Sequence, residues 1–138
     1  MRGAMNGIPL LLRLARQEAD ARRVALAEAE RAREAVARQR AALDVQRAAE
    51  DRLAQGDPLA MASWAAWNSA ARRQEARLDR SMAERLAAEE AIREALREDF
   101  ATIKRLEITL EQKQRAALRM AARKAEQRLE DTELQRRR

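Results

Sequence analysis

Residues 55–58, Gln-Gly-Asp-Pro, decide the fold, because they carry a helix stop and a helix start within four residues. Gly56 can adopt the left-handed backbone conformation that ends a helix. Asp57 can cap the next helix, and Pro58 fits its first turn, where the missing N–H costs no hydrogen bond. Between Pro9 and the end of the chain no other glycine or proline occurs. The sequence therefore predicts a single turn.

Two long helices are predicted on either side of this turn. The first runs from about residue 8 to 54, with Asn6 as its cap and Pro9 in its first turn, and the second runs from about residue 58 to 136. Strong helix formers dominate the composition, whereas only 2% of the residues are aromatic, which is too little for a globular core. We therefore expect an all-α fold, a long two-helix antiparallel coiled-coil hairpin that forms one domain over residues 1–138.

Each helix needs an apolar stripe to bury, because most helical stability in water comes from packing. In the second helix the stripe follows spacings of three, four and seven, as in coiled-coil seams. In the first helix the stripe is rich in alanine and follows an eleven-residue rhythm, which predicts a nearly straight or weakly right-handed course. Phe100 is expected to belong to the seam. The other expected seam residues are Leu78, Met82, Ile92, Leu96, Ile103, Leu106, Leu110, Ala117 and Met120 in the second helix, and Leu10, Leu14, Ala21, Ala25, Ala32, Val36, Leu43 and Ala54 in the first.

The second helix is longer than the first by about 30 residues, so a simple hairpin leaves the part beyond about residue 104 without a partner. Two interpretations stay open. In the first, the second helix breaks near residues 68–70, where Asn68 and Ser69 are weak helix formers, and a short extra helix forms the tip. In the second, the bare end of the helix packs on another protein.

Trp64 and Trp67 are the only tryptophans, and they lie three residues apart beside the turn, so they share one helix face. They either plug the end of the coiled coil or form an exposed anchor for a partner, because tryptophan is enriched at binding hot spots. The sequence favours neither interpretation over the other.

The composition argues against an enzyme. The chain has no cysteine and no histidine, which removes thiolate chemistry, the commonest general base and the commonest metal ligand. No phosphate-binding loop or nucleophile motif is present. The neighbouring carboxylates Glu89-Glu90 and Glu130-Asp131 point about 100° apart on a helix, so we expect them to be solvated surface. We expect no catalytic residue, no cofactor and no metal site.

Charge of both signs is interleaved along the chain. The net charge is +6, and residues 1–54 carry 11 basic and 8 acidic side chains against 18 and 15 in residues 55–138. This pattern is typical of a solvated helix surface rather than a phosphate-binding stripe. Two alternatives remain beside an adaptor role. One is a basic helical nucleic-acid-binding protein, and the other is a homodimeric coiled-coil scaffold in which the bare ends of two chains pair.

Three motifs in the C-terminal third resemble those of the flagellar export protein family FliJ, whose injectisome counterparts are the YscO-type stalk proteins. They are residues 104–107 (Lys-Arg-Leu-Glu), residues 110–113 (Leu-Glu-Gln-Lys) and above all residues 126–131 (Glu-Gln-Arg-Leu-Glu-Asp), which resemble the closing motif of the family. Trp64 and Trp67 ahead of a long helix also resemble the aromatic stretch that follows the hairpin turn in this family. Together with the hairpin layout, the resemblance spans most of the chain.

The resemblance implies a non-enzymatic stalk of the type III export apparatus, similar to the γ stalk of rotary ATPases. In the family the paired termini enter the pore of the export ATPase hexamer and promote its assembly, the tip side reaches the export gate protein FlhA, and export chaperones are bound. This implies a gate contact at Trp64 and Trp67. The ring contact falls on Arg13, Arg16, Lys124, Arg128 and Arg136.

A cytoplasmic location is expected. The apolar patch near the N-terminus, residues 8–12, is too short for a signal-peptide core or a membrane span. The resemblance implies a place peripheral to the inner membrane at the flagellar base. Whether a flagellar or an injectisome system is served stays open.

Overall fold

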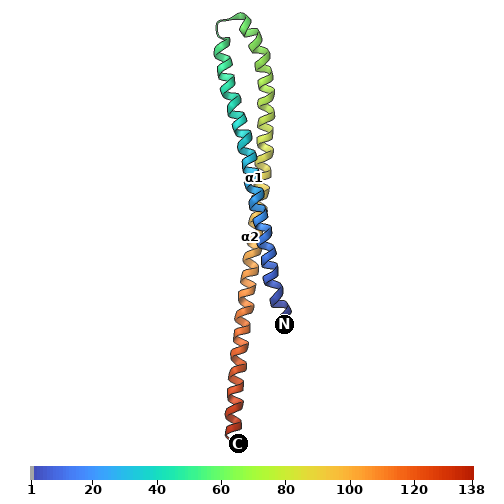
Figure 1. Ribbon diagram of the computed structural model, residues 1–138, viewed down its shortest axis with the longest axis vertical. Coiled ribbons are helices and arrows are strands. Elements are labelled where there is room, and N and C mark those ends of the chain that lie inside the picture. The colour runs from blue at the N-terminus through green and yellow to red at the C-terminus, as the bar shows by residue number, and fades with distance from the viewer. Residues whose placement is uncertain (1) are drawn as a thin grey trace. The chain divides into compact units, whose positions relative to one another are not determined.

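The computed structural model describes the backbone of residues 2–138 and the side chains of residues 7–138. It contains two α-helices, α1 (Arg2–Ala54) and α2 (Pro58–Arg136), joined by one turn (Figure 1). Among the described residues there is no strand. The prediction of an all-α chain with two long helices is confirmed.

The turn has the structure that the sequence predicts. Gly56 has a φ of 83°, in the left-handed region, and directly follows the last turn of α1. Asp57 caps α2, because its side-chain Oδ1 accepts a hydrogen bond from the backbone N–H of Leu59 at 3.0 Å. Its backbone carbonyl also accepts a hydrogen bond from the N–H of Met61, at 2.9 Å. The stop and the restart of the helix are thus both confirmed.

The predicted start of the first helix near residue 8 is wrong, because α1 begins at Arg2. Pro9 therefore lies inside the helix, where it removes one hydrogen bond of the backbone ladder. Its neighbours Ile8 and Leu12 are buried, and burial of an apolar face stabilises a helix more than local propensity does. Asn6, predicted as the cap, stands within α1, and its side chain lies outside the described residues.

Of the two interpretations left open for the second helix, the one with a break near residues 68–70 and a short extra helix at the tip is wrong. α2 is one helix from Pro58 to Arg136. Asn68 is half-buried and Ala71 is buried. Packing therefore keeps this stretch helical in spite of the weak helix propensities of Asn68 and Ser69.

The chain divides into two compact units. The turn unit is Ala21–Leu96, and the terminal unit combines Met1–Asp20 with Arg97–Arg138. In the turn unit, the two helices run antiparallel on either side of the turn (Figure 1). Its buried apolar residues are Val36, Ala54, Ala71 and Leu78, and those of the terminal unit are Ile8, Leu12 and Ala19.

The less exposed positions of α1 repeat every seven residues, so the predicted eleven-residue rhythm is wrong. Leu10, Leu14 and Ala21, which that rhythm placed in the seam, are exposed. A seven-residue repeat is the one that left-handed coiled coils use. One series consists of Leu12, Ala19, Leu26, Arg33, Arg40, Arg47 and Ala54, and the other includes Ile8, Ala15, Ala29, Val36 and Leu43.

The predicted seam of α2 is confirmed up to Leu110 and wrong beyond it. All seven predicted positions from Leu78 to Leu110 are buried or half-buried, whereas Ala117 and Met120 are exposed. Phe100 is also outside the seam, with 42% of its surface exposed. Asp99 takes the seam position instead, because it follows Ile92 by seven residues and Leu96 by three.

Every residue from 111 to 138 is exposed. The prediction that the end of the second helix lacks a partner is confirmed, although the exposed part begins about six residues later than expected. The two helices are still in contact beyond residue 104, because Arg16 of α1 pairs with Glu107 of α2.

Candidate functional site

A hollow of about 290 Å³ lies at the tip of the turn unit, close to the turn. Its walls are largely apolar, and both predicted tryptophans belong to them. On α1 the lining residues are Glu50, Leu53 and Ala54, and on α2 they are Ala60, Ser63, Trp64 and Trp67. The turn brings these two groups together because they lie at similar distances in sequence from Gly56 and Asp57.

The two tryptophans are half-buried, so they neither close the end of the coiled coil nor stand fully free of it. The indole Nε1–H of Trp64 donates a hydrogen bond to Oδ1 of Asp51 at 2.6 Å. This contact holds one indole against α1 and fixes its orientation. Trp67 lines the same hollow one helical turn further along α2.

The tip differs in charge from the rest of the chain. Residues 48–71 contain three acidic side chains and a single basic one, Arg52, although the whole chain carries +6. The Nε–H of Arg52 donates to the backbone carbonyl of Ala48 at 3.2 Å. Large apolar side chains next to the turn are exposed, with Leu59 reaching 83%. The tip is thus an acidic and apolar surface on a basic protein.

The predicted ring-side residues all lie in the terminal unit. Arg13 is exposed, and Arg16 pairs with Glu107 at 3.2 Å on an open surface, which stabilises the packing of the two helices only slightly. A second surface hollow, of about 280 Å³, lies beside this pair. Lys124, Arg128 and Arg136 stand on the exposed part of α2.

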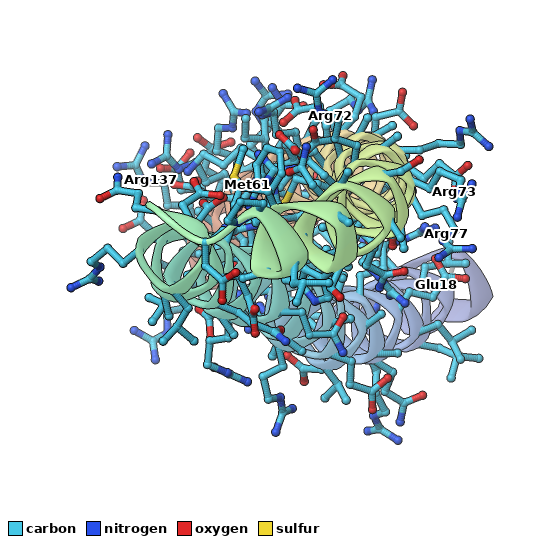
Figure 2. The ribbon with its side chains drawn as sticks, turned by 90° about the horizontal axis from the view of Figure 1, so that it is seen from above. Glu18, Met61, Arg72, Arg73, Arg77 and Arg137 are labelled. Atoms are coloured by element: carbon cyan, nitrogen blue, oxygen red, sulfur yellow. The ribbon has the colours of Figure 1, made fainter. Side chains whose placement is uncertain are left out.

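A basic stretch covers part of this exposed helix. Residues 112–125 contain no acidic side chain. Away from this stretch, basic side chains also point outwards, as Figure 2 shows for Arg72, Arg73 and Arg77 of α2. The five basic residues of the stretch are Lys113, Arg115, Arg119, Arg123 and Lys124.

Beyond Leu110, lysines appear at the heptad positions that form the seam before it. Lys113, Ala117, Met120 and Lys124 follow at those positions, so only a small and a flexible apolar residue remain there, between two lysines. Leu118 and Leu129 are instead eleven residues apart and share another face of the helix, about a quarter turn from the seam. The exposed end of α2 therefore presents its own narrow apolar strip, which basic side chains flank.

Charged side chains occupy the seam of the turn unit. Glu89 is only 1% exposed, so the prediction that it is solvated surface is wrong. The Nε–H of Arg33 donates to its Oε2 at 2.6 Å, and Arg93 donates to Oε1 from one turn along α2. The hydrogen bond from Arg33, opposed by burial and helped by Arg93, lowers the pKa of Glu89 from its ordinary value.

A second ionic cluster lies closer to the turn. Arg40 on α1 donates to Oε1 of Glu75 at 2.6 Å and to Oδ1 of Asp79 at 3.0 Å. The hydrogen bond with Asp79 is the main cause that raises the pKa of Arg40. Arg47 reaches the other oxygen of Glu75 at 2.7 Å. These pairs fix the register of the two helices, because a shift of either helix by one turn separates them.

Neither cluster has the arrangement of a catalytic or metal site. Each carboxylate in them faces guanidinium groups, and no group of three or more potential metal ligands was found among the described residues. The described parts of both helices also contain no stretch apolar and long enough to cross a membrane. The tip hollow and the exposed end of α2 are the candidate surfaces for binding a partner.

Sequence reasoning missed the partners of the tryptophans and the charged seam. Asp51 lies three residues before the end of α1 and Trp64 six residues after the start of α2, so an antiparallel hairpin brings them near each other. The seven-residue spacing of Arg33, Arg40 and Arg47 is the signal that reveals the seam of α1.

Comparison of the chain with protein-family models, with curated proteins and with solved structures found no match.

Proposed function

We propose that this chain is a non-enzymatic stalk of the bacterial flagellar type III export apparatus, resembling FliJ. It binds the export ATPase hexamer through the terminal unit and the export gate protein FlhA through the tip, and it also binds export chaperones. This function places it in the cytoplasm, peripheral to the inner membrane at the flagellar base. The resemblance of residues 126–131 to the closing motif of the family supports the proposal.

The exposed end of α2 is the single structural observation that carries the proposal. All side chains of residues 111–138 are available to a partner. The basic residues around the strip of Leu118 and Leu129 suit a partner surface with acidic side chains around an apolar groove. Lys124 and Arg128 belong to this region and are our candidates for the ring contact, together with Arg13, Arg16 and Arg136.

The tip supports a second and different contact. Trp64 and Trp67 are half-buried around a hollow, and the exposed Leu59 adds apolar surface. Tryptophans in partly open hollows are frequent binding hot spots. An adaptor with two chemically distinct surfaces can bind a ring and a gate at the same time, without any catalytic group of its own.

A pull-down with a type III export ATPase tests the proposal. The wild-type chain should bind the ATPase and raise both its hexamer fraction and its rate of ATP hydrolysis. Lys124→Glu combined with Arg128→Glu should abolish both effects, whereas the control Arg72→Glu with Arg73→Glu, on exposed positions of the turn unit, should not. Absence of binding by the wild type, or equal losses in both double variants, would contradict it.

A basic nucleic-acid-binding protein is the second candidate, because residues 112–125 carry five basic and no acidic side chains. Binding to phosphates releases counterions and weakens steeply as salt rises. Duplex DNA or RNA titrated at low salt distinguishes the two functions. Measurable affinity that falls steeply with NaCl would favour this candidate, and no affinity at low salt would remove it.

A further inference from the structure

We propose that the tip hollow binds a basic side chain, an arginine or a lysine, that a partner protein presents between apolar neighbours. The inference deepens the tip contact of the proposed function by giving the chemistry that the contact recognises. Three features of the hollow support it: an uncompensated carboxylate, two indole rings and an apolar rim.

The carboxylate is that of Glu50, which is half-buried in the wall of the hollow. Among the described side chains, Glu50 has no hydrogen-bond or ion-pair partner, in contrast to its neighbour Asp51, which accepts the indole N–H of Trp64. The only basic side chain of the tip, Arg52, donates its Nε–H to its own helix. A half-buried carboxylate without a cation gains most from a cationic ligand, because a charge-assisted hydrogen bond then replaces partly lost hydration.

The indoles of Trp64 and Trp67 complete the recognition of a cation. Aromatic faces attract guanidinium and ammonium groups, and tryptophan does so more strongly than the other aromatic residues. The hollow of about 290 Å³ lies near the lower limit of ligand pockets, so it admits one long side chain and no larger element. Arginine and lysine also carry an apolar stem, which suits the lining of Leu53 and Ala54.

The exposed apolar residues around the hollow indicate which residues the partner carries beside its arginine or lysine. Leu53 lines the hollow, and Leu59 and Met61 are the exposed sequence neighbours of its lining residue Ala60. Burial of such large apolar side chains favours association. The partner segment therefore places apolar residues next to its arginine or lysine. The acidic balance of residues 48–71 attracts such a segment and repels an acidic one.

Intrinsic fluorescence can test the proposal, because the only two tryptophans of the chain both line the hollow. The probe is the peptide acetyl-Ala-Leu-Arg-Leu-Ala-amide, compared with the same peptide in which neutral citrulline replaces arginine. The arginine peptide should change the emission saturably, and the citrulline peptide should bind about tenfold more weakly. Equal dissociation constants for the two peptides, or no saturable change with the arginine peptide, would overturn the proposal.

Substitutions locate the effect at the carboxylate. Glu50→Gln should reduce the preference for arginine to less than about twofold, while Glu50→Asp, which keeps the charge, should retain part of it. The matched control is Glu84→Gln, at an exposed position of the turn unit, which should keep the full preference. A Glu50→Gln chain that is as helical as the wild type and still prefers arginine would refute the assignment.

The outcome is independent of the stalk proposal. Failure of the peptide titration with intact binding of the export ATPase leaves the stalk standing and removes only the basic side chain as the ligand of the tip. If the ATPase experiment fails and the peptide titration succeeds, the basic side chain stands as the ligand of the tip and the stalk proposal falls.

Discussion

Replacing Gly56 by alanine should destabilise the turn unit, whereas replacing Gly7 by alanine should stabilise the terminal unit. An added Cβ meets no atom within 4 Å at either position. The difference therefore comes from the backbone alone. Gly56 has a φ of 83°, where a non-glycine residue costs roughly 1–2 kcal/mol, partly offset by the lower entropy of the unfolded chain. Gly7 lies inside α1, where alanine is favoured over glycine by about 1 kcal/mol.

Urea unfolding measures both effects. The fluorescence of Trp64 and Trp67 follows the turn unit, and far-UV circular dichroism follows all helices. A net loss of about 1 kcal/mol from Gly56→Ala corresponds to a midpoint lower by roughly 0.5 M urea. Gly7→Ala should raise the midpoint of the dichroism transition, because alanine is the better helix former. A Gly56→Ala variant as stable as the wild type would refute the predicted left-handed helix stop.

Three further predictions concern the seam. Leu78→Ala should lower the free energy of unfolding by about 2 kcal/mol, because the side chain of Leu78 is only 7% exposed. The control Leu86→Ala, at a position that is 46% exposed, should lower it by about 0.5 kcal/mol or less, and urea unfolding measures both values. Arg47→Leu should raise the stability by about 1 kcal/mol, because the buried Nε and Nη2 of Arg47 have no acceptor; a lower urea midpoint would contradict this. The pKa of Glu89 is lowered, so its contribution is fully present above the ordinary glutamate pKa and is lost as the pH falls through the lower folded value. The stability gap between the wild type and Glu89→Gln should therefore shrink from about pH 7 to about pH 3, while the control Glu84→Gln should show no such change.

The turn and the two helices could be predicted from the sequence because their signals are local. A glycine, a capping aspartate and a proline in succession leave few backbone alternatives at residues 56–58. The helix start near residue 8 and the break near residues 68–70 were wrong because Pro9, Asn68 and Ser69 are weak local signals. Packing of Ile8, Leu12 and Ala71 overrides them.

The seam of α1 could not be found from apolar residues, because much of it is charged. Arg33, Arg40 and Arg47 occupy consecutive heptad positions, and Glu89 faces the first of them. A buried carboxylate of this kind is identified only when the register of the two helices is known. The exposure of Phe100 has the same origin, because Asp99 holds the seam position beside it.

The candidate site was predicted in part. Trp64 and Trp67 were identified by their residue type and spacing, but Glu50 became a candidate only when the turn brought α1 beside them. The basic stretch 112–125 is visible in the sequence, yet its exposure follows from where the packing of α1 ends. The contacts with an export ATPase and an export gate stay predictions.

A spin-label distance across the turn unit tests the central claim, that the chain folds back at Gly56 and pairs its own two helices. The chain has no cysteine, so labels at Gln39→Cys and Ala83→Cys, both at exposed positions, are selective. Paired helices have axes about 8–10 Å apart, so we predict a label distance under about 30 Å that persists after dilution with unlabelled protein. The two labels are 44 residues apart, so along one straight helix, at about 1.5 Å per residue, they would be near 65 Å apart. A distance of that size, or a short distance that disappears on dilution, would contradict the claim.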